Sequence, residues 1–290
     1  MEFKMKLEYT PRSPINNLSF TEKTFTRMQT TYELNTNEIG IALVDLWNFG
    51  WENSPFVPSL GWELSLERGV SHALRKKEII ENLIVPVVNE LREYGVKIFH
   101  CNHASFLEHF PQWKDSTTEV ERETLRKKDS KVDKVKAKQN AVHEAFPDNK
   151  WISEWKAKHT NDVFNIKWSD EQAKTYDQIR IPNLIEPKEG DLLVYSSKQF
   201  HRLLSKNKIH CLFYMGFETD ECVQNSDYGI INMHQFGYMT NIVRDCTTTY
   251  ESAETLEGLW RTKVAIENIE KRCGYSTTSF DLLNSIRNSI

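Results

Sequence analysis

Two reactive side chains lie where buried strands are predicted to end. Asp45 closes the apolar run of residues 39–46, and Cys222 follows the apolar run of residues 209–216 at the predicted start of a helix. A cysteine in the first turn of a helix faces unpaired backbone N–H groups, which lower its pKa and favour the thiolate. A nearby carboxylate can take the thiol proton and return it to a leaving group. Position alone leaves two alternatives open: a small packed cysteine, and an aspartate that only caps a strand.

The elements that must position this pair alternate between strand and helix. The strands are short apolar runs, which are typical of strands buried on both faces of a parallel sheet. We expect strands at residues 39–46, 96–101, 191–194, 209–216 and 238–245, and helices beginning at Pro86 and over residues 199–206, 219–236 and 251–272. This order predicts an α/β fold, a three-layer α/β/α, Rossmann-like arrangement around a mostly parallel sheet with right-handed crossovers. Ligands bind at the carboxyl ends of strands in such sheets, so Asp45 and Cys222 should face one site.

Two segments lack this alternation. Residues 1–38 are polar and rich in Thr and Asn, and we interpret them as an N-terminal extension, irregular or hairpin-like, outside the sheet. Residues 39–290 form one domain in this interpretation, with a charged insertion at about residues 110–185. Residues 47–66 hold three tryptophans and two prolines, which predicts an aromatic loop directly after Asp45.

Composition narrows the class of partner. The 290 residues carry 37 basic and 41 acidic side chains, a net charge of −4, which does not favour nucleic acid or membrane lipid as a partner. No apolar run approaches the roughly 20 residues that a membrane span needs, and no apolar signal core follows the N-terminus. A cytoplasmic protein with a small-molecule substrate is expected. The five cysteines are odd in number, scattered and without a CxxC pair, which favours reduced thiols over disulfides.

The segment over residues 209–250 resembles the nucleophile region of the isochorismatase-like cysteine hydrolases, the family related to nicotinamidase and N-carbamoylsarcosine amidase. That region typically has an apolar strand, the pattern G-(V)-x-T-(D/N)-x-C-V, a helix, G-(Y/F), a strand and an aspartate. The matching residues are Gly216, Thr219, Asp220, Cys222, Val223, Gly237, Tyr238 and Asp245. The segment IALVDLWN at residues 41–48 resembles the family's first strand, with Trp47 where a glutamine is usual. The resemblance covers about residues 39–101 and 185–272 and indicates a long, divergent branch.

The resemblance implies an activity and a site. It implies acyl transfer to Cys222, hydrolysis of the thioester with Asp45 as base, and cleavage of a C–N bond in a small amide, ureido or lactam compound. It also implies a cis peptide between Phe217 and Glu218 that aims the N–H groups of Glu218 and Cys222 at one oxyanion. The substrate pocket is expected to include Trp47, Asn48, Trp51, His103 and Thr219. Relatives often form dimers or tetramers, so a homo-oligomer is expected.

The third member of the family triad, a lysine, is displaced in this sequence. That lysine usually follows a Gly-Asp pair by about five residues. Here the pair is Gly190-Asp191, and the count reaches Ser196, two residues before Lys198. Either the loop is remodelled and Lys198 completes the triad, or this branch works without the lysine.

Three alternatives remain beside a cysteine amidohydrolase. Cys101, His103 and His109 could hold Zn²⁺, but no short-spaced pair of ligands supports that site, and we expect no metal or cofactor. The displaced lysine and the charged insertion favour a non-catalytic protein that binds a metabolite or a partner. Hydrolysis of a vinyl ether, as in isochorismatases, uses the aspartate without the cysteine, so the presence of Cys222 argues against it.

Overall fold

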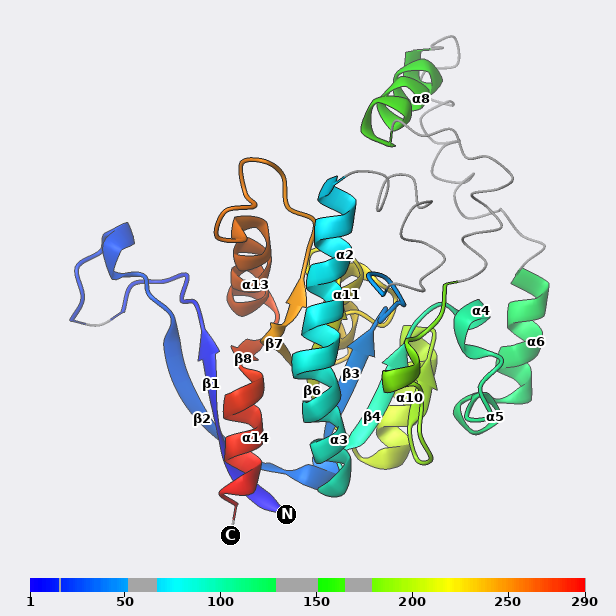
Figure 1. Ribbon diagram of the computed structural model, residues 1–290. Coiled ribbons are helices and arrows are strands. Elements are labelled where there is room, and N and C mark those ends of the chain that lie inside the picture. The colour runs from blue at the N-terminus through cyan, green and yellow to red at the C-terminus, as the bar shows by residue number, and fades with distance from the viewer. Residues whose placement is uncertain (16, 52–66, 129–150, 165–178, 290) are drawn as a thin grey trace.

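The centre of the molecule is an eight-stranded sheet in the order β2-β1-β8-β7-β6-β3-β4-β5 (Figure 1). The computed structural model describes residues 1–15, 17–51, 67–128, 151–164 and 179–289. The strands are β1 (Glu2–Tyr9), β2 (Met28–Asn35), β3 (Ile39–Val44), β4 (Lys97–Cys101), β5 (Leu192–Val194), β6 (Cys211–Phe217), β7 (Met239–Thr248) and β8 (Tyr275–Thr277). Strands β3 to β8 pair in parallel, so the five predicted strands and the mostly parallel sheet are confirmed.

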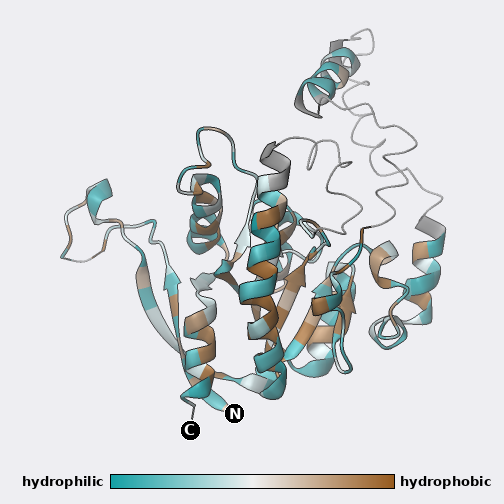
Figure 2. Cartoon of the chain, in the orientation of Figure 1, coloured by the Kyte–Doolittle hydropathy of each residue, from teal (hydrophilic) through white to brown (hydrophobic). Residues whose placement is uncertain are grey.

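Strand β3 shows why the sheet needs helices on both faces. All six of its residues are buried, and it pairs in parallel with β6 on one side and β4 on the other. Ile41 and Leu43 belong to one hydrophobic cluster, whereas Ala42 and Val44 belong to another, because successive side chains of a strand point to opposite faces. Figure 2 shows hydrophobic residues concentrated on these central strands.

Two layers of helices cover the two faces, which confirms the three-layer prediction. One face carries a continuous helix over residues 67–93, made of α2 (Glu67–Ile79), the π-helix η3 (Ile80–Ile84) and α3 (Val85–Glu93), with α14 (Ser279–Arg287) beside α3. The other face carries α10 (Ser197–Asn207), α11 (Cys222–Asn225), α12 (Ile230–Gln235) and α13 (Trp260–Arg272). The remaining elements are η1 (Glu22–Thr24), η2 (Thr36–Glu38), α4 (Ala104–Leu107), α5 (Trp113–Ser116), α6 (Glu119–Lys128), α8 (Trp151–Phe164) and η4 (Asn183–Ile185).

The N-terminal residues form a hairpin that extends the sheet. Strand β1 pairs antiparallel with β2, and it meets β8 through Glu8 and Ser276. The buried carboxylate of Glu270 fastens the hairpin, since its Oε1 accepts from Nε of Arg27 at 2.8 Å and from Oγ of Ser276 at 2.6 Å. The expectation that residues 1–38 lie outside the sheet is therefore wrong. Alternate side chains of β1 enter the core despite the polar composition of the segment: Phe3, Met5 and Leu7.

The helix that was predicted to begin at Pro86 begins at Glu67, and Pro86 lies inside it. Proline lacks an N–H and its ring crowds the preceding turn of an α-helix. The π-helix η3 ends two residues before Pro86. Its wider turn lets the helix continue although Pro86 cannot donate the usual backbone hydrogen bond of an α-helix.

Two other predicted helices are shorter than the sequence indicated, because side chains distant in the sequence intervene. Residues 219–236 divide into α11 and α12, and in the break Asp227 accepts both the N–H and the hydroxyl of Ser197 on α10. Residues 251–259 precede α13 as turns. The Glu251 carboxylate accepts the N–H groups of Arg261 and Thr262 and so caps the helix at its true start.

Parts of two predicted segments lie outside the described residues. These are residues 52–66 of the aromatic loop, and residues 129–150 and 165–178 of the charged insertion. Helices α6 and α8 belong to the described part of the insertion. Within the described ranges, no helix is both long enough and apolar enough to cross a membrane.

Candidate active site

Asp45 and Cys222 lie at the same carboxyl edge of the sheet because their strands are neighbours. Strand β3 ends at Val44, which pairs with Gly216 near the end of β6. The two strands approach so closely there that a Cβ on Gly216 would lie 2.0 Å from the Val44 carbonyl oxygen, so only glycine fits. Asp45 then turns out of the strand with φ of 47°, a left-handed conformation that aspartate tolerates better than most residues.

The carboxylate of Asp45 is buried and has one oxygen in use. Its Oδ1 accepts from the hydroxyl of Tyr228 at 2.9 Å, whereas Oδ2 has no well-formed hydrogen bond. Burial raises the pKa of Asp45 from 3.8 to about 6, although the thiol of Cys222, the charge of His103 and the hydroxyl of Tyr228 each lower it. A carboxylate of this pKa can accept a proton near neutral pH and give it back.

Cys222 begins α11, as predicted, but its ionisation differs from the prediction. Burial, followed by the nearby carboxylate of Asp45, raises the pKa of the half-buried thiol above its ordinary 9.0. Helix α11 ends at Asn225 and is too short for a strong dipole. The expected lowering of the Cys222 pKa is therefore wrong, and this thiol needs a base at the moment it reacts.

The loop between β6 and α11 leaves two N–H groups beside the thiol. The peptide between Phe217 and Glu218 is cis, which confirms the prediction. The carbonyl oxygen of Glu218 accepts from the N–H groups of Glu221 and Val223 at 3.1 Å each. Among the hydrogen bonds of the described residues, none uses the N–H of Glu218 or of Cys222. These two N–H groups remain able to bind an oxyanion.

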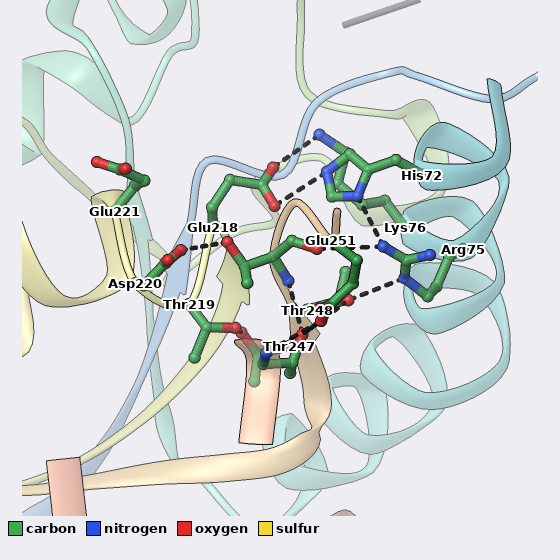
Figure 3. A network of polar contacts seen from close by, with 12 residues as sticks. His72, Arg75, Lys76, Glu218, Thr219, Asp220, Glu221, Thr247, Thr248 and Glu251 are labelled. Carbon is green, nitrogen blue, oxygen red and sulfur yellow. Dashed lines mark hydrogen bonds and ion pairs between the residues drawn. The ribbon is translucent and has the colours of Figure 1, made fainter. Parts of the chain in front are cut away.

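The side chain of Glu218 enters a buried ionic cluster that the sequence did not indicate (Figure 3). Its Oε1 accepts from Nζ of Lys76 at 2.9 Å, and its Oε2 lies 3.0 Å from Nε2 of His72, off the ideal hydrogen-bond direction. Both partners are buried and come from α2. Burial alone would raise the pKa of Glu218, but the charge of Lys76 and the adjacent ring of His72 outweigh it and hold that pKa below its usual value. The cluster therefore contains an ionised carboxylate on the same residue whose backbone N–H is able to bind an oxyanion.

Two of the predicted pocket residues lie close to Asp45. His103 is exposed, and its charge is among the largest influences on the Asp45 pKa. Trp47 is half-buried, and its Nε1 donates to Oδ1 of Asn102 at 3.2 Å. The same Asn102 oxygen accepts the N–H of His103 at 2.8 Å, so a buried asparagine holds both residues in place.

The other three pocket candidates are tied to neighbouring structure. Asn48 exchanges hydrogen bonds with the backbone of Arg180. Nε1 of Trp51 donates to Glu81 of η3 at 2.9 Å. Thr219 is fully buried, and its hydroxyl lies 2.7 Å from that of Thr247. Their hydrogen bonds place these side chains as supports of the loops around Asp45 and Cys222.

Lys198 and the alternative zinc ligands are not brought into this arrangement. Lys198 is exposed in the first turn of α10, and the largest charge effects on Asp45 come from His103 and Glu218 instead. Cys101 is buried in the sheet and points toward the carbonyl of Phe99, whereas His103 and His109 are exposed. In the part of the chain that the structure describes, no three His, Cys, Asp or Glu side chains are grouped to hold a metal.

Comparison with known proteins gives matches among solved structures only. No protein-family model and no curated protein matches the sequence. A cysteine hydrolase from Pseudomonas syringae pv. phaseolicola is similar over 88% of this chain and 94% of that chain, at 12% identity and a TM-score of 0.48. An isochorismatase family protein from Burkholderia thailandensis matches over 88% of this chain and 98% of that chain, at 11% identity and a TM-score of 0.46. The nicotinamidase of Staphylococcus aureus is similar over 83% of this chain and 97% of that chain, at 11% identity and a TM-score of 0.38.

Proposed function

We propose that this chain is a cysteine hydrolase that cleaves a C–N bond of a small amide, ureido or lactam compound through a thioester on Cys222. One observation carries the proposal. A buried carboxylate with a pKa of about 6, Asp45, lies beside Cys222, and the backbone N–H groups of Glu218 and Cys222 make no hydrogen bond to any other described residue. Base, nucleophile and oxyanion donors are the three parts that acyl transfer requires.

The reaction divides into two steps in which the proton is accounted for. Asp45 takes the thiol proton as Cys222 attacks the carbonyl carbon, and the N–H groups of Glu218 and Cys222 hold the resulting oxyanion. The C–N bond then breaks, the Asp45 proton passes to the leaving nitrogen, and a thioester remains on Cys222. Asp45, ionised again, takes a proton from water as that water attacks the thioester. Release of the acid returns the proton to the thiolate.

The raised pKa of Cys222 favours this concerted route over a preformed thiolate. A thiol with a raised pKa is a poor nucleophile until a base removes its proton. The Oδ2 atom of Asp45 has no well-formed hydrogen bond, so it is the oxygen available for that proton. Tyr228 holds the other oxygen and fixes the direction of the carboxylate.

Two variants test the proposal with p-nitrophenyl acetate, an activated ester that transfers its acetyl group to a thiol and releases a coloured phenolate. Cys222→Ala should abolish acetylation of the protein, which mass spectrometry would show. If the Cys222→Ala variant were still acetylated at the wild-type rate, the proposal would be refuted. Cys246→Ala is the matched control, because Cys246 is buried in β7.

A non-catalytic binding protein is the second candidate, and the raised pKa of Cys222 favours it. Asp45→Asn separates the two. Loss of the Asp45 charge makes the thiol easier to ionise, so an incidental cysteine would react faster with every electrophile. If Asp45 is the base, the same variant should react faster with iodoacetamide at high pH but more slowly with the ester near neutral pH.

A further inference from the structure

The ionic cluster around Glu218 is buried although buried ion pairs add little to stability. Lys76 and Glu218 are each less than a tenth exposed, and Nζ of Lys76 also lies 4.6 Å from the centre of the Phe49 ring. Taking both charges out of water is costly, and apolar residues of similar volume would often serve the fold as well. The cluster therefore calls for an explanation other than stability.

His72 in this cluster is held in one tautomer by Arg75. Nη2 of Arg75 lies 3.0 Å from Nδ1 of His72, and a guanidinium can only donate. Nδ1 therefore accepts, and the ring proton is on Nε2, which faces the Glu218 carboxylate. Arg75 is itself fixed, because it donates to Oγ1 of Thr248 at 2.9 Å and to the carbonyl of Thr249 at 3.1 Å. Three residues of α2 thus converge on one carboxylate and on the end of β7 (Figure 3).

The same end of β7 holds the loop that carries Cys222. The N–H of Thr219 donates to the carbonyl of Thr248 at 3.1 Å, and the hydroxyl of Thr249 donates to Asp220. The loop is therefore fixed at Thr219 by the backbone of Thr248, the last residue of β7, and at Asp220 by the side chain of Thr249, the next residue. Glu218 is itself held at two groups: its carbonyl oxygen accepts the N–H groups of Glu221 and Val223, and its carboxylate contacts Lys76 and His72. Because both the backbone and the side chain of Glu218 are held, its N–H has little freedom to turn.

We propose that Lys76 and His72 are positioning residues, which clamp the Glu218 carboxylate so that the N–H groups of Glu218 and Cys222 converge on the substrate oxyanion. This inference rests on the proposed function and adds the residues that fix its oxyanion site. The long helix of α2 is the rigid support, and the Glu218 carboxylate transmits its position to the loop. Lys76 acts on the site only through the Glu218 carboxylate, and it does not contact the reacting atoms in this scheme.

The clamp can be tested by comparing two reactions of Cys222. Acylation by p-nitrophenyl acetate passes through a tetrahedral oxyanion, whereas alkylation by iodoacetamide displaces iodide at a CH₂ group and forms none. A change in thiol ionisation affects both rates. The ratio of the acylation rate to the alkylation rate therefore reports how well the two N–H groups are placed for the oxyanion.

Four variants complete the experiment. Lys76→Met removes the cation, and His72→Leu removes the second contact. His72→Gln keeps both functions of the ring, since its amide oxygen can accept from Arg75 and its amide nitrogen can donate to Glu218. Lys77→Met is the matched control on the same helix, because Lys77 lies 3.9 Å from Glu81 and does not contact Glu218 in the described ion pairs. Circular dichroism establishes that each variant is folded, and the His72 pair decides the matter if Lys76→Met does not fold.

We expect the ratio to fall about tenfold or more in Lys76→Met, since displacing or losing an oxyanion donor costs on the order of 10²-fold in rate. His72→Leu should change the ratio in the same direction, and His72→Gln and Lys77→Met should stay near the wild-type ratio. A wild-type ratio in the folded Lys76→Met and His72→Leu variants would overturn the clamp alone. Acylation that survives in Cys222→Ala would overturn the proposed function and the clamp with it.

Discussion

Removal of one hydroxyl, in Tyr228→Phe, should shift the pH at which the site loses activity. The Tyr228 hydroxyl donates to Oδ1 of Asp45 at 2.9 Å, and the ring is buried in the hydrophobic cluster on that face of the sheet. Phenylalanine keeps the ring and its packing but cannot donate. The change therefore acts on Asp45, whose charged form loses a hydrogen-bond donor.

The size of the shift follows from the energy of that bond. A hydrogen bond to a charged group contributes about 1.5–3 kcal/mol, and one pKa unit corresponds to about 1.4 kcal/mol, so the bond accounts for about 1–2 units. The pKa of Asp45 is about 6 with the bond in place and should rise to about 7–8 without it. At about pH 7 the ionised fraction of Asp45 would fall from roughly nine-tenths to roughly one-half or less.

The assay is the rate of acylation by p-nitrophenyl acetate between about pH 5 and about pH 9. Asp45 acts as a base only when ionised, so the rate should fall as the pH drops through its pKa. In Tyr228→Phe this fall should begin about 1–2 pH units higher than in the wild type. Tyr238→Phe is the control, because the Tyr238 hydroxyl bonds to Nδ1 of His201 at 2.7 Å instead of to Asp45. An unmoved acid limb in Tyr228→Phe would refute the reasoning.

Three further outcomes are expected. Burial raises the Asp45 pKa from 3.8 to about 6, so the folded state binds this proton more tightly and ionisation destabilises it as the pH rises through that interval. Asp45→Asn should therefore be more stable than wild type to urea at about pH 7, by up to about 3 kcal/mol, with no gain below about pH 4; lower stability at neutral pH would contradict this. Alkylation of Cys222 by iodoacetamide should still accelerate above the thiol's ordinary pKa of 9.0, whereas a plateau near neutral pH would show a lowered pKa instead. Glu251→Gln weakens the cap of α13, so calorimetry should show a stability loss of about 1–2 kcal/mol that is absent from the exposed-site control Glu254→Gln.

The sequence by itself determined the central strands and the two residues at their ends. The short apolar runs around residues 39–46 and 209–216, each followed by residues typical of a loop, favour strands buried on both faces of a parallel sheet. Asp45 lies at the end of the first run and Cys222 follows the second after a short loop, so the local pattern already placed both residues at the carboxyl edge of the sheet. The cis peptide between Phe217 and Glu218 was expected only because the segment resembles the isochorismatase-like hydrolases.

Only the tertiary structure decided what surrounds this pair. Tyr228 meets Asp45 across 183 residues of sequence, and Lys76 meets Glu218 across 142, and no local period or spacing encodes such contacts. The direction of the Cys222 pKa was also beyond the sequence. A helix start favours the thiolate, but burial and the adjacent Asp45 carboxylate outweigh it, and both depend on how the two strand ends come together.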